Sequence, residues 1–232
     1  LTDVGGIAVV IREPMDAPAD GCSRPTGRIR NDAQGKRNAT PRCMAKLATR
    51  ERRVSTPGLH HRQRRMVQVE PERAAVDPTV RGHVKAWIAA MTDEQIQRDI
   101  DQSLAATGAD QGPLGTIGFC LGARAVVRAM MRLPDRFVCG AGWHPSFLAD
   151  DQADSPHLTP EQIVGNLYLG IGDADQGQSI AMHQRFLDAT AEMPNVKVGI
   201  WPGADHGFTW PGYATYNEVA SNGCWKTTIG MF

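Results

Sequence analysis

The five residues Gly118-Phe119-Cys120-Leu121-Gly122 constrain the fold more than any other feature of this sequence. The apolar stretch 114–118 predicts a short buried strand that leads into them, and residues 123–131 predict a helix directly afterwards. On so sharp a turn, a side chain at either glycine would collide with the neighbouring strand or helix. The pattern is typical of a nucleophile elbow with Cys120 as the nucleophile, at a helix N-terminus that favours the thiolate. The alternative is a small buried cysteine in a Gly-rich turn.

Apolar strands and amphipathic helices alternate along most of the chain. Strands are expected at 6–12, 114–118, 137–142, 166–171 and 196–201. Helices are expected over about 79–91, 92–107, 123–131, 179–193 and 213–231. Thr92 and Gln95 have the spacing of a capping box at the start of the second helix. This alternation predicts a three-layer α/β fold with a mostly parallel sheet flanked by helices, and residues 1–232 fit one such domain.

Three chemically capable side chains each follow an apolar strand, in the order Cys120, Asp173, His206. Functional groups gather at the carboxyl ends of parallel strands, and nucleophile, acid, histidine is the chain order of α/β-hydrolase triads. Asp175 is a rival for the acid because it lies in the same loop, and His144 is a rival base beyond another strand. We prefer His206 because it follows the acid and lies in a Gly-flanked loop.

Residues 21–70 do not share this regularity. They contain thirteen basic and three acidic residues, a net charge of +10, although the whole chain is neutral. Their apolar residues are isolated, with a period of neither 2 nor 3.6, so we expect no strand there and only weak helix potential near 44–53. Arg-rich, patternless sequence between regular flanks is what translation in a wrong reading frame would produce. Reading the coding DNA in all three frames tests that hypothesis.

The irregular segment has consequences for folding and for partners. Without a strand from it, we expect a gap in the sheet between 6–12 and the elbow strand, unpaired backbone groups there, marginal folding and little activity. The other interpretation of 21–70 is a disordered basic arm that binds nucleic acid. Its arginines are scattered and it has almost no aromatic residues to stack on bases, which argues against a nucleic-acid partner.

The cysteines indicate a reducing compartment. They are five in number, widely spaced and without a C-x-x-C pair, which argues against a disulfide framework and against a zinc site. We therefore expect the cytoplasm, and neither a metal nor another cofactor. No apolar run approaches the length of a membrane span, and no signal peptide is evident. The chain begins with Leu1, as a fragment would.

Four segments together resemble the dienelactone hydrolase family. They are the elbow with its continuation Ala123-Arg124, then His144-Pro145-Ser146, Gly170-Ile171-Gly172-Asp173, and Pro202-Gly203-Ala204-Asp205-His206-Gly207-Phe208. The resemblance covers about 76–232 and the strand 6–12 with its loop. It implies an α/β-hydrolase fold with Cys120 as nucleophile, Asp173 as acid and His206 as base. It also implies a small ester or lactone substrate, of which carboxymethylenebutenolide is the best known in the family.

The implied mechanism is a thioester route. His206 takes the proton of Cys120, the thiolate attacks the carbonyl, Asp173 orients the histidine, and water hydrolyses the thioester. The oxyanion would be held by the Leu121 N–H and by a second N–H from the loop after the first strand, assigned to Met15. The family places a glutamate near the resting thiol, and Glu13 is its weak match here.

Aromatic residues follow the histidine closely. Phe208, Trp210 and Tyr213 could line the substrate pocket, or they could be ordinary core or surface residues. A hydrolase-like protein that binds a ligand without turnover is the remaining alternative for function.

Overall fold

The computed structural model describes residues 7–12, 29–30, 52–55, 77–79, 82, 86, 92–107 and 112–232. Its strands are β1 (Ile7–Arg12), β2 (Ile29–Arg30), β3 (Arg52–Ser55), β4 (Leu114–Phe119), β5 (Phe137–Trp143), β6 (Asn166–Gly172) and β7 (Val196–Trp201). Its α-helices are α4 (Asp93–Thr107), α5 (Leu121–Arg132), α6 (Ile180–Thr190) and α7 (Glu218–Met231), with short 3-10 helices η1 (Pro156–Leu158) and η2 (Pro160–Gln162).

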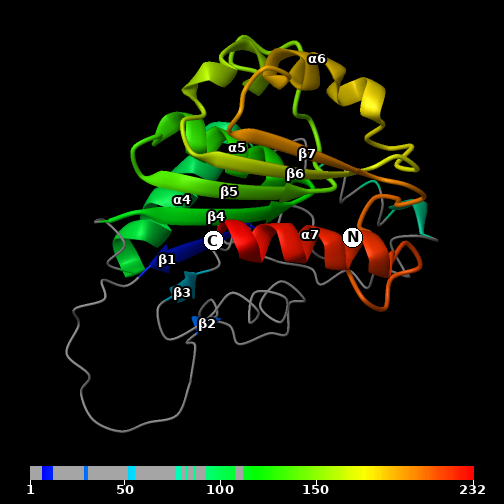
Figure 1. The fold of residues 1–232 in the computed structure, drawn as a ribbon, viewed down its shortest axis with the longest axis horizontal. Coiled ribbons are helices and arrows are strands. Elements are labelled where there is room, and N and C mark those ends of the chain that lie inside the picture. Colours follow the sequence, from blue (N-terminus) through cyan, green and yellow to red (C-terminus); the bar gives the residue numbers. More distant parts are fainter. Residues whose placement is uncertain are drawn as a thin grey trace, which may run out of the picture.

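The strands form a single sheet in the order β2-β3-β1-β4-β5-β6-β7 (Figure 1). Strands β4 to β7 are parallel to one another, and β1 is antiparallel to both of its neighbours, β3 and β4. The expected α/β-hydrolase architecture, a mostly parallel sheet flanked by helices, is confirmed. The parallel strands all end at the same edge of the sheet, so the loops after β4, β5, β6 and β7 meet there.

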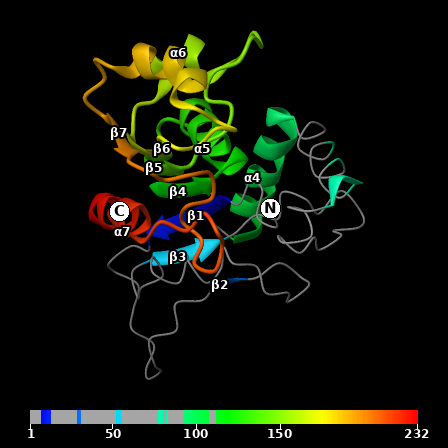
Figure 2. The same ribbon diagram turned by 90° about the vertical axis from the view of Figure 1, so that its right-hand side faces the viewer.

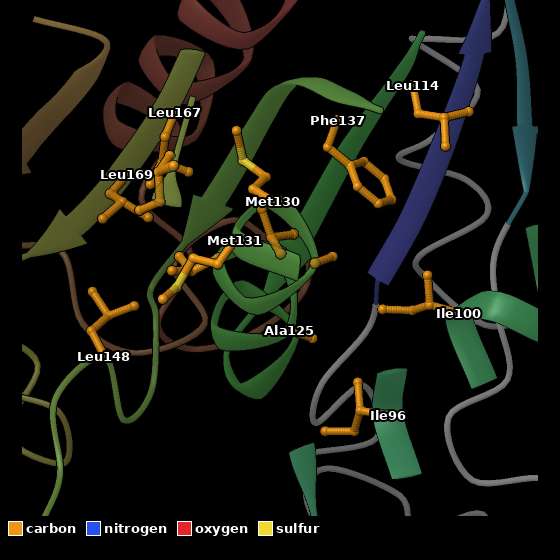
Figure 3. Packing of buried hydrophobic residues seen from close by; sticks show 14 of the residues in the cluster. Ile96, Ile100, Leu114, Ala125, Met130, Met131, Phe137, Leu148, Leu167 and Leu169 are labelled. Atoms are coloured by element: carbon orange, nitrogen blue, oxygen red, sulfur yellow. The ribbon is translucent and has the colours of Figure 1, made fainter. Parts of the chain in front are cut away.

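Helices cover both faces of the sheet (Figure 2). On one face, α4, α5 and α6 pack on the sheet through a buried apolar cluster that includes Ile100, Met130, Phe137 and Leu167 (Figure 3). On the other face, α7 packs through a second cluster rich in aromatic residues, with Trp143, Phe208 and Trp225. The sheet is thus the middle of three layers, and nearly all residues of β4, β5 and β6 are buried.

Most of the predicted elements of the second half of the chain are present. The capping box at the start of α4 forms as expected: the Gln95 N–H donates to Thr92 Oγ1 (3.2 Å) and the Thr92 N–H to Gln95 Oε1 (3.3 Å). The last helix begins at Glu218 rather than near Tyr213, because 213–217 form turns and the Asn217 side chain caps α7 by accepting from the Ala220 N–H. The apolar stripe expected within 80–91 lies outside the described residues.

Two expectations about the N-terminal part are wrong. The segment 21–70 contributes two short strands, β2 and β3, and β3 pairs with β1. The expected gap beside the elbow strand does not exist, because β1 itself pairs with β4, from Ile7 opposite Gly118 to Ile11 opposite Leu114. Antiparallel pairing satisfies the backbone groups of both strands directly. The rest of 21–70, including any basic arm, lies outside the described residues.

No helix among the described residues is long and apolar enough to cross a membrane.

A test of the elbow's packing uses two glycines with opposite surroundings. A Cβ at Gly118 would lie 2.1 Å from the Gly122 carbonyl oxygen, whereas a Cβ at Gly230, in α7, meets nothing within 4 Å. We expect Gly118→Ala to lower the free energy of unfolding by about 3 kcal/mol, since backbone must move. Gly230→Ala should be neutral or raise it by up to about 1 kcal/mol. Urea unfolding of both variants measures this, and equal stabilities would contradict the steric argument.

Candidate active site

Cys120 occupies the turn between β4 and α5 in a strained conformation. Its φ of 55° lies in the left-handed region, which a non-glycine residue adopts at a cost. The backbone is held there because the Cys120 N–H donates to the Trp143 carbonyl (3.1 Å) and the Cys120 carbonyl accepts from the Ala123 N–H (3.1 Å). Cys120 is the N-cap residue of α5, and its side chain is half-buried. The local geometry is that of the predicted elbow.

The histidine at this edge of the sheet pairs with Asp175. His206 Nδ1 lies 2.7 Å from Asp175 Oδ2. The preferred acid, Asp173, is exposed and bonds elsewhere. Its Oδ1 accepts from the Gly203 N–H (2.7 Å), so it ties the loop after β6 to the loop after β7. The expectation that Asp173 partners the histidine is therefore wrong, and the rival Asp175 holds that place, because Asp173 follows β6 directly and lies too early in the loop.

The surroundings of Asp175 favour its ionised form. Its side chain is buried, and its second oxygen, Oδ1, accepts from the Gly177 N–H (3.0 Å) and the Gln178 N–H (2.8 Å). Burial alone would raise the pKa of this carboxyl, but hydrogen bonding and charge attraction from His206, together with these two backbone N–H groups, lower its pKa below the ordinary value. A fixed carboxylate of this kind orients the imidazole and stabilises its protonated form.

Cys120 and His206 shift each other's protonation in opposite directions. Burial opposes ionisation of both, yet contacts with Asp175 and Cys120 raise the pKa of His206 to about 10. Burial would likewise raise the pKa of Cys120, but hydrogen bonds and charge from His206, and hydrogen bonds from Ser146 and the Leu121 N–H, lower it. The two directions together favour a thiolate paired with an imidazolium.

Cys224 shows what burial does without a cation. Its thiol lies in the aromatic cluster, 3.6 Å from the Tyr168 hydroxyl, and desolvation raises its pKa to about 12. The described cysteines Cys120, Cys139 and Cys224 are all free. The pKa of Cys120 is lowered where that of Cys224 is raised, so the surroundings rather than the residue type set the protonation of each thiol.

His144, the rival base, lies beside the predicted one. Its ring is buried, with Nε2 2.9 Å from Thr209 Oγ1, and its ring centre is 5.1 Å from that of His206 in an edge-to-face arrangement. Desolvation and the nearby charge of His206 hold the pKa of His144 well below its ordinary value. His144 is therefore a neutral neighbour of His206 and contacts no carboxylate in the described part of the chain. The preference for His206 as the histidine of the set is supported by this geometry.

The other predicted site residues fall into three groups. Leu121 contributes its backbone N–H next to the Cys120 sulfur, as an oxyanion donor would. Phe208 and Trp210 are buried in the aromatic cluster, where Trp210 packs on Phe119 at 4.8 Å and Phe208 packs on His144 at 5.4 Å between ring centres. Their contact with substrate stays a prediction that this burial does not favour. Glu13 and Met15 lie outside the described residues.

Sequence reasoning missed the buried residues that hold the site's loops together. Arg124, on the first turns of α5, forms ion pairs with Asp93 of α4 (2.8 Å) and Asp150 (2.7 Å) and donates to the Phe147 carbonyl. Gln178 accepts from the Phe147 N–H (2.9 Å) while its own N–H bonds to Asp175. No local pattern announces such contacts, because each joins residues that are far apart in the sequence or depends on the shape of a loop.

No group of three or more His, Cys, Asp or Glu side chains within the described ranges could hold a metal ion.

The assignment of the acid can be tested by a matched pair of variants. Asp175→Asn removes the charge against His206, so we expect the pKa of His206 to fall, the thiolate to lose its partner, and iodoacetamide to label Cys120 about tenfold more slowly at pH 7. Asp173→Asn, an equal change on an exposed residue, should leave the rate within about twofold. Peptide mass spectrometry measures labelling at Cys120. A larger loss from Asp173→Asn would restore Asp173 to the site.

Comparison with known proteins places this chain in a family. The family model described as the dienelactone hydrolase family matches residues 29–232. A Synechocystis sp. protein provisionally named carboxymethylenebutenolidase is 32% identical over 127 residues, which cover 51% of this chain and 49% of that protein. The chain thus spans about half the length of this curated relative.

Solved structures share the fold at low sequence identity. A Klebsiella pneumoniae protein provisionally assigned as a dienelactone hydrolase superposes with a TM-score of 0.66 and 18% identity, over 83% of this chain and 80% of that one. A CIB-like hydrolase from Thermoplasma acidophilum gives 0.50 and 16%, over 82% and 75%. At such identities the likeness concerns the fold.

Proposed function

We propose an activity for a chain that belongs to the dienelactone hydrolase family: hydrolysis of an ester or lactone bond in a small molecule, with Cys120 as nucleophile. The observation that carries the proposal is the set Cys120, His206 and Asp175 at the carboxyl edge of the sheet. In it, Asp175 lies 2.7 Å from His206, and the pKa shifts of His206 and Cys120 favour the thiolate–imidazolium pair.

Acylation begins from the ionised pair. The Cys120 thiolate attacks the substrate carbonyl carbon, a C–S bond forms, and the carbonyl electron pair moves to oxygen. The Leu121 N–H is placed to donate to that oxygen, at the N-terminal end of α5 where the helix dipole favours negative charge. As the C–O bond breaks, the imidazolium of His206 gives its proton to the departing oxygen. The product is a thioester on Cys120 and a neutral His206.

Deacylation uses the neutral histidine. With Cys120 acylated, His206 has lost the thiolate that raised its pKa, so it can accept a proton from water. The hydroxide attacks the thioester carbonyl, the C–S bond breaks, and the thiolate leaves with the electron pair. Asp175, held by two backbone N–H groups, stabilises the imidazolium that re-forms. A lactone is opened by the same two steps, but its hydroxyl and acid stay in one molecule.

A thiolate nucleophile fits a reducing compartment. Cys120 would be lost to oxidation more readily than an un-ionised thiol, and the described cysteines are all free. A location in the cytoplasm is therefore part of this proposal.

The proposal is tested by pre-steady-state kinetics with an activated ester such as p-nitrophenyl acetate. We expect a burst close to one equivalent of p-nitrophenol, followed by slower turnover. Cys120→Ala should abolish the burst, and His206→Ala should reduce the rate of the burst at least a hundredfold. Cys139→Ala, a cysteine elsewhere on β5, should keep it and serves as the control for general thiol effects. Folded protein with no burst would refute the enzyme.

The pKa shifts also predict how thiol reactivity depends on pH. The thiolate is the reactive form, so lowering the pKa of Cys120 extends its reactivity to lower pH than the ordinary 9.0. The raised pKa of His206, about 10, means that the imidazolium partner persists below that pH and is lost above it. We therefore expect the midpoint for iodoacetamide labelling of Cys120 to lie below 9.0. The rate of the burst, in which the imidazolium gives up its proton, should fall above about pH 10.

Cys224 gives the internal reference, because its pKa is raised to about 12. Labelling of Cys224 in the folded protein should be negligible throughout the same range. Parallel titration curves for the two cysteines would contradict the assignment of an activated thiolate to Cys120.

A further inference from the structure

The loop after β5 is strained in a way that the elbow does not explain. Among the described residues, only three non-glycine residues have φ in the left-handed region: Cys120 (55°), His144 (38°) and Phe147 (56°). Each such conformation costs free energy and persists only where surrounding contacts hold it. Cys120 is strained by its elbow. His144 and Phe147 flank Pro145-Ser146, so this four-residue segment, 144–147, is bent at both ends.

Four hydrogen bonds fix segment 144–147 to the rest of the site. The His144 N–H donates to the Gly170 carbonyl (2.7 Å), and the Ser146 N–H donates to the Cys120 carbonyl (3.1 Å). At the far end, the Phe147 N–H donates to Gln178 Oε1 (2.9 Å) and the Phe147 carbonyl accepts from Arg124. The segment is therefore attached to β6, the elbow, the Asp175 loop and α5. Strain maintained by so many contacts indicates that the position of Pro145-Ser146 between the bends matters.

Of these two residues, Ser146 carries a polar side chain, and its hydroxyl meets the proposed nucleophile. Ser146 Oγ lies 3.3 Å from Cys120 Sγ, and the serine is only 4% exposed. A thiolate can accept a hydrogen bond but cannot donate one, so beside an ionised Cys120 the serine must be the donor. Hydrogen bonds to a charged acceptor are the stronger ones. The strained backbone thus holds the Ser146 hydroxyl next to the Cys120 sulfur, and this contact does not involve His206.

We propose that Ser146 is a further catalytic residue, whose hydroxyl donates a hydrogen bond to the Cys120 thiolate. The inference rests on the proposed function, because it concerns the reacting sulfur of that mechanism. The bond acts where the sulfur carries charge: in the resting pair and when the thiolate leaves the thioester. In the second case His206 is occupied with the water proton, so a donor independent of the histidine assists the leaving group.

The groups that can set the charge on Cys120 are few within the described structure. His206 faces it from the loop after β7, with Asp175 behind the histidine, and the Leu121 N–H faces it from α5. His144 contacts His206 and is held neutral by burial. Removal of the Ser146 hydroxyl therefore leaves the charged partners of Cys120 in place, and its effect can be measured separately.

The test is the pH dependence of iodoacetamide labelling of Cys120 in the full chain, read by peptide mass spectrometry. In Ser146→Ala the thiolate loses a donor, so we expect the labelling midpoint to rise and the rate at pH 6 to fall about tenfold. On the high-pH plateau the rate should be unchanged or higher, because a thiolate that is less stabilised is more nucleophilic. Ser146→Thr, which keeps a hydroxyl, should restore the midpoint.

Ser155→Ala controls for the loss of a buried hydroxyl. Ser155 is fully buried, and its Oγ accepts from the Asp150 N–H (2.9 Å) rather than contacting Cys120. This variant should leave the midpoint where it is in the wild type. If Ser146→Ala is too unstable to study, Ser146→Cys retains the shape with a weaker donor, and its midpoint should lie above that of the wild type.

Three results would overturn the proposal. They are an unchanged midpoint in Ser146→Ala, an equal shift in Ser155→Ala, or a uniform loss of rate at all pH values, which indicates structural damage. Labelling needs no substrate, so it separates this inference from the proposed function. A shifted midpoint without any ester burst in the wild type would refute the hydrolase and keep the serine–thiolate bond. A burst in the wild type together with an unshifted midpoint in Ser146→Ala would support the hydrolase and refute the serine–thiolate bond.

Discussion

The close approach of β4 to α5 is the constraint on which the site depends. At Gly118 the strand passes so near the Gly122 carbonyl that no Cβ fits between them. This contact forces the chain to turn within one residue, and Cys120 takes the left-handed conformation that the turn requires. The same turn places the half-buried Cys120 side chain at the carboxyl edge of the sheet and makes Cys120 the N-cap residue of a helix with a buried core face. The stability of the sheet maintains this strained conformation of Cys120.

The second layer of organisation is electrostatic. A carboxylate satisfied by two backbone N–H groups holds His206, and His206 in turn favours the thiolate. Each member is partly removed from water, which would oppose its charge if it stood alone. Cys224 illustrates the difference, since burial without a cation raises its pKa to about 12. The lowered pKa of Cys120 is thus a property of the set of three and of the loops that bring them together.

Local patterns in the sequence were strong enough to predict much of this. The strand and helix periods, the elbow glycines and the Thr92 capping box all depend on neighbours within a few positions. The errors concern longer distances. Asp173 and Asp175 lie in one polar loop, and only the path of that loop determines that Asp175 turns inward while Asp173 bonds to Gly203. Likewise, the antiparallel pairing of β1 with β4 joins strands that are far apart in the sequence, as the register from Ile7 opposite Gly118 records.

By itself, the sequence determined the α/β architecture and the glycine-flanked turn at Cys120, because period, glycine placement and capping are local properties of the chain. The tertiary structure decided which aspartate holds His206, that His144 stays a neutral neighbour, and that Ser146 meets the sulfur. These outcomes follow from strained loops whose conformations are held by contacts across the fold, such as those of Arg124 and Gln178 with Phe147. Such contacts have no signature in the residues that make them.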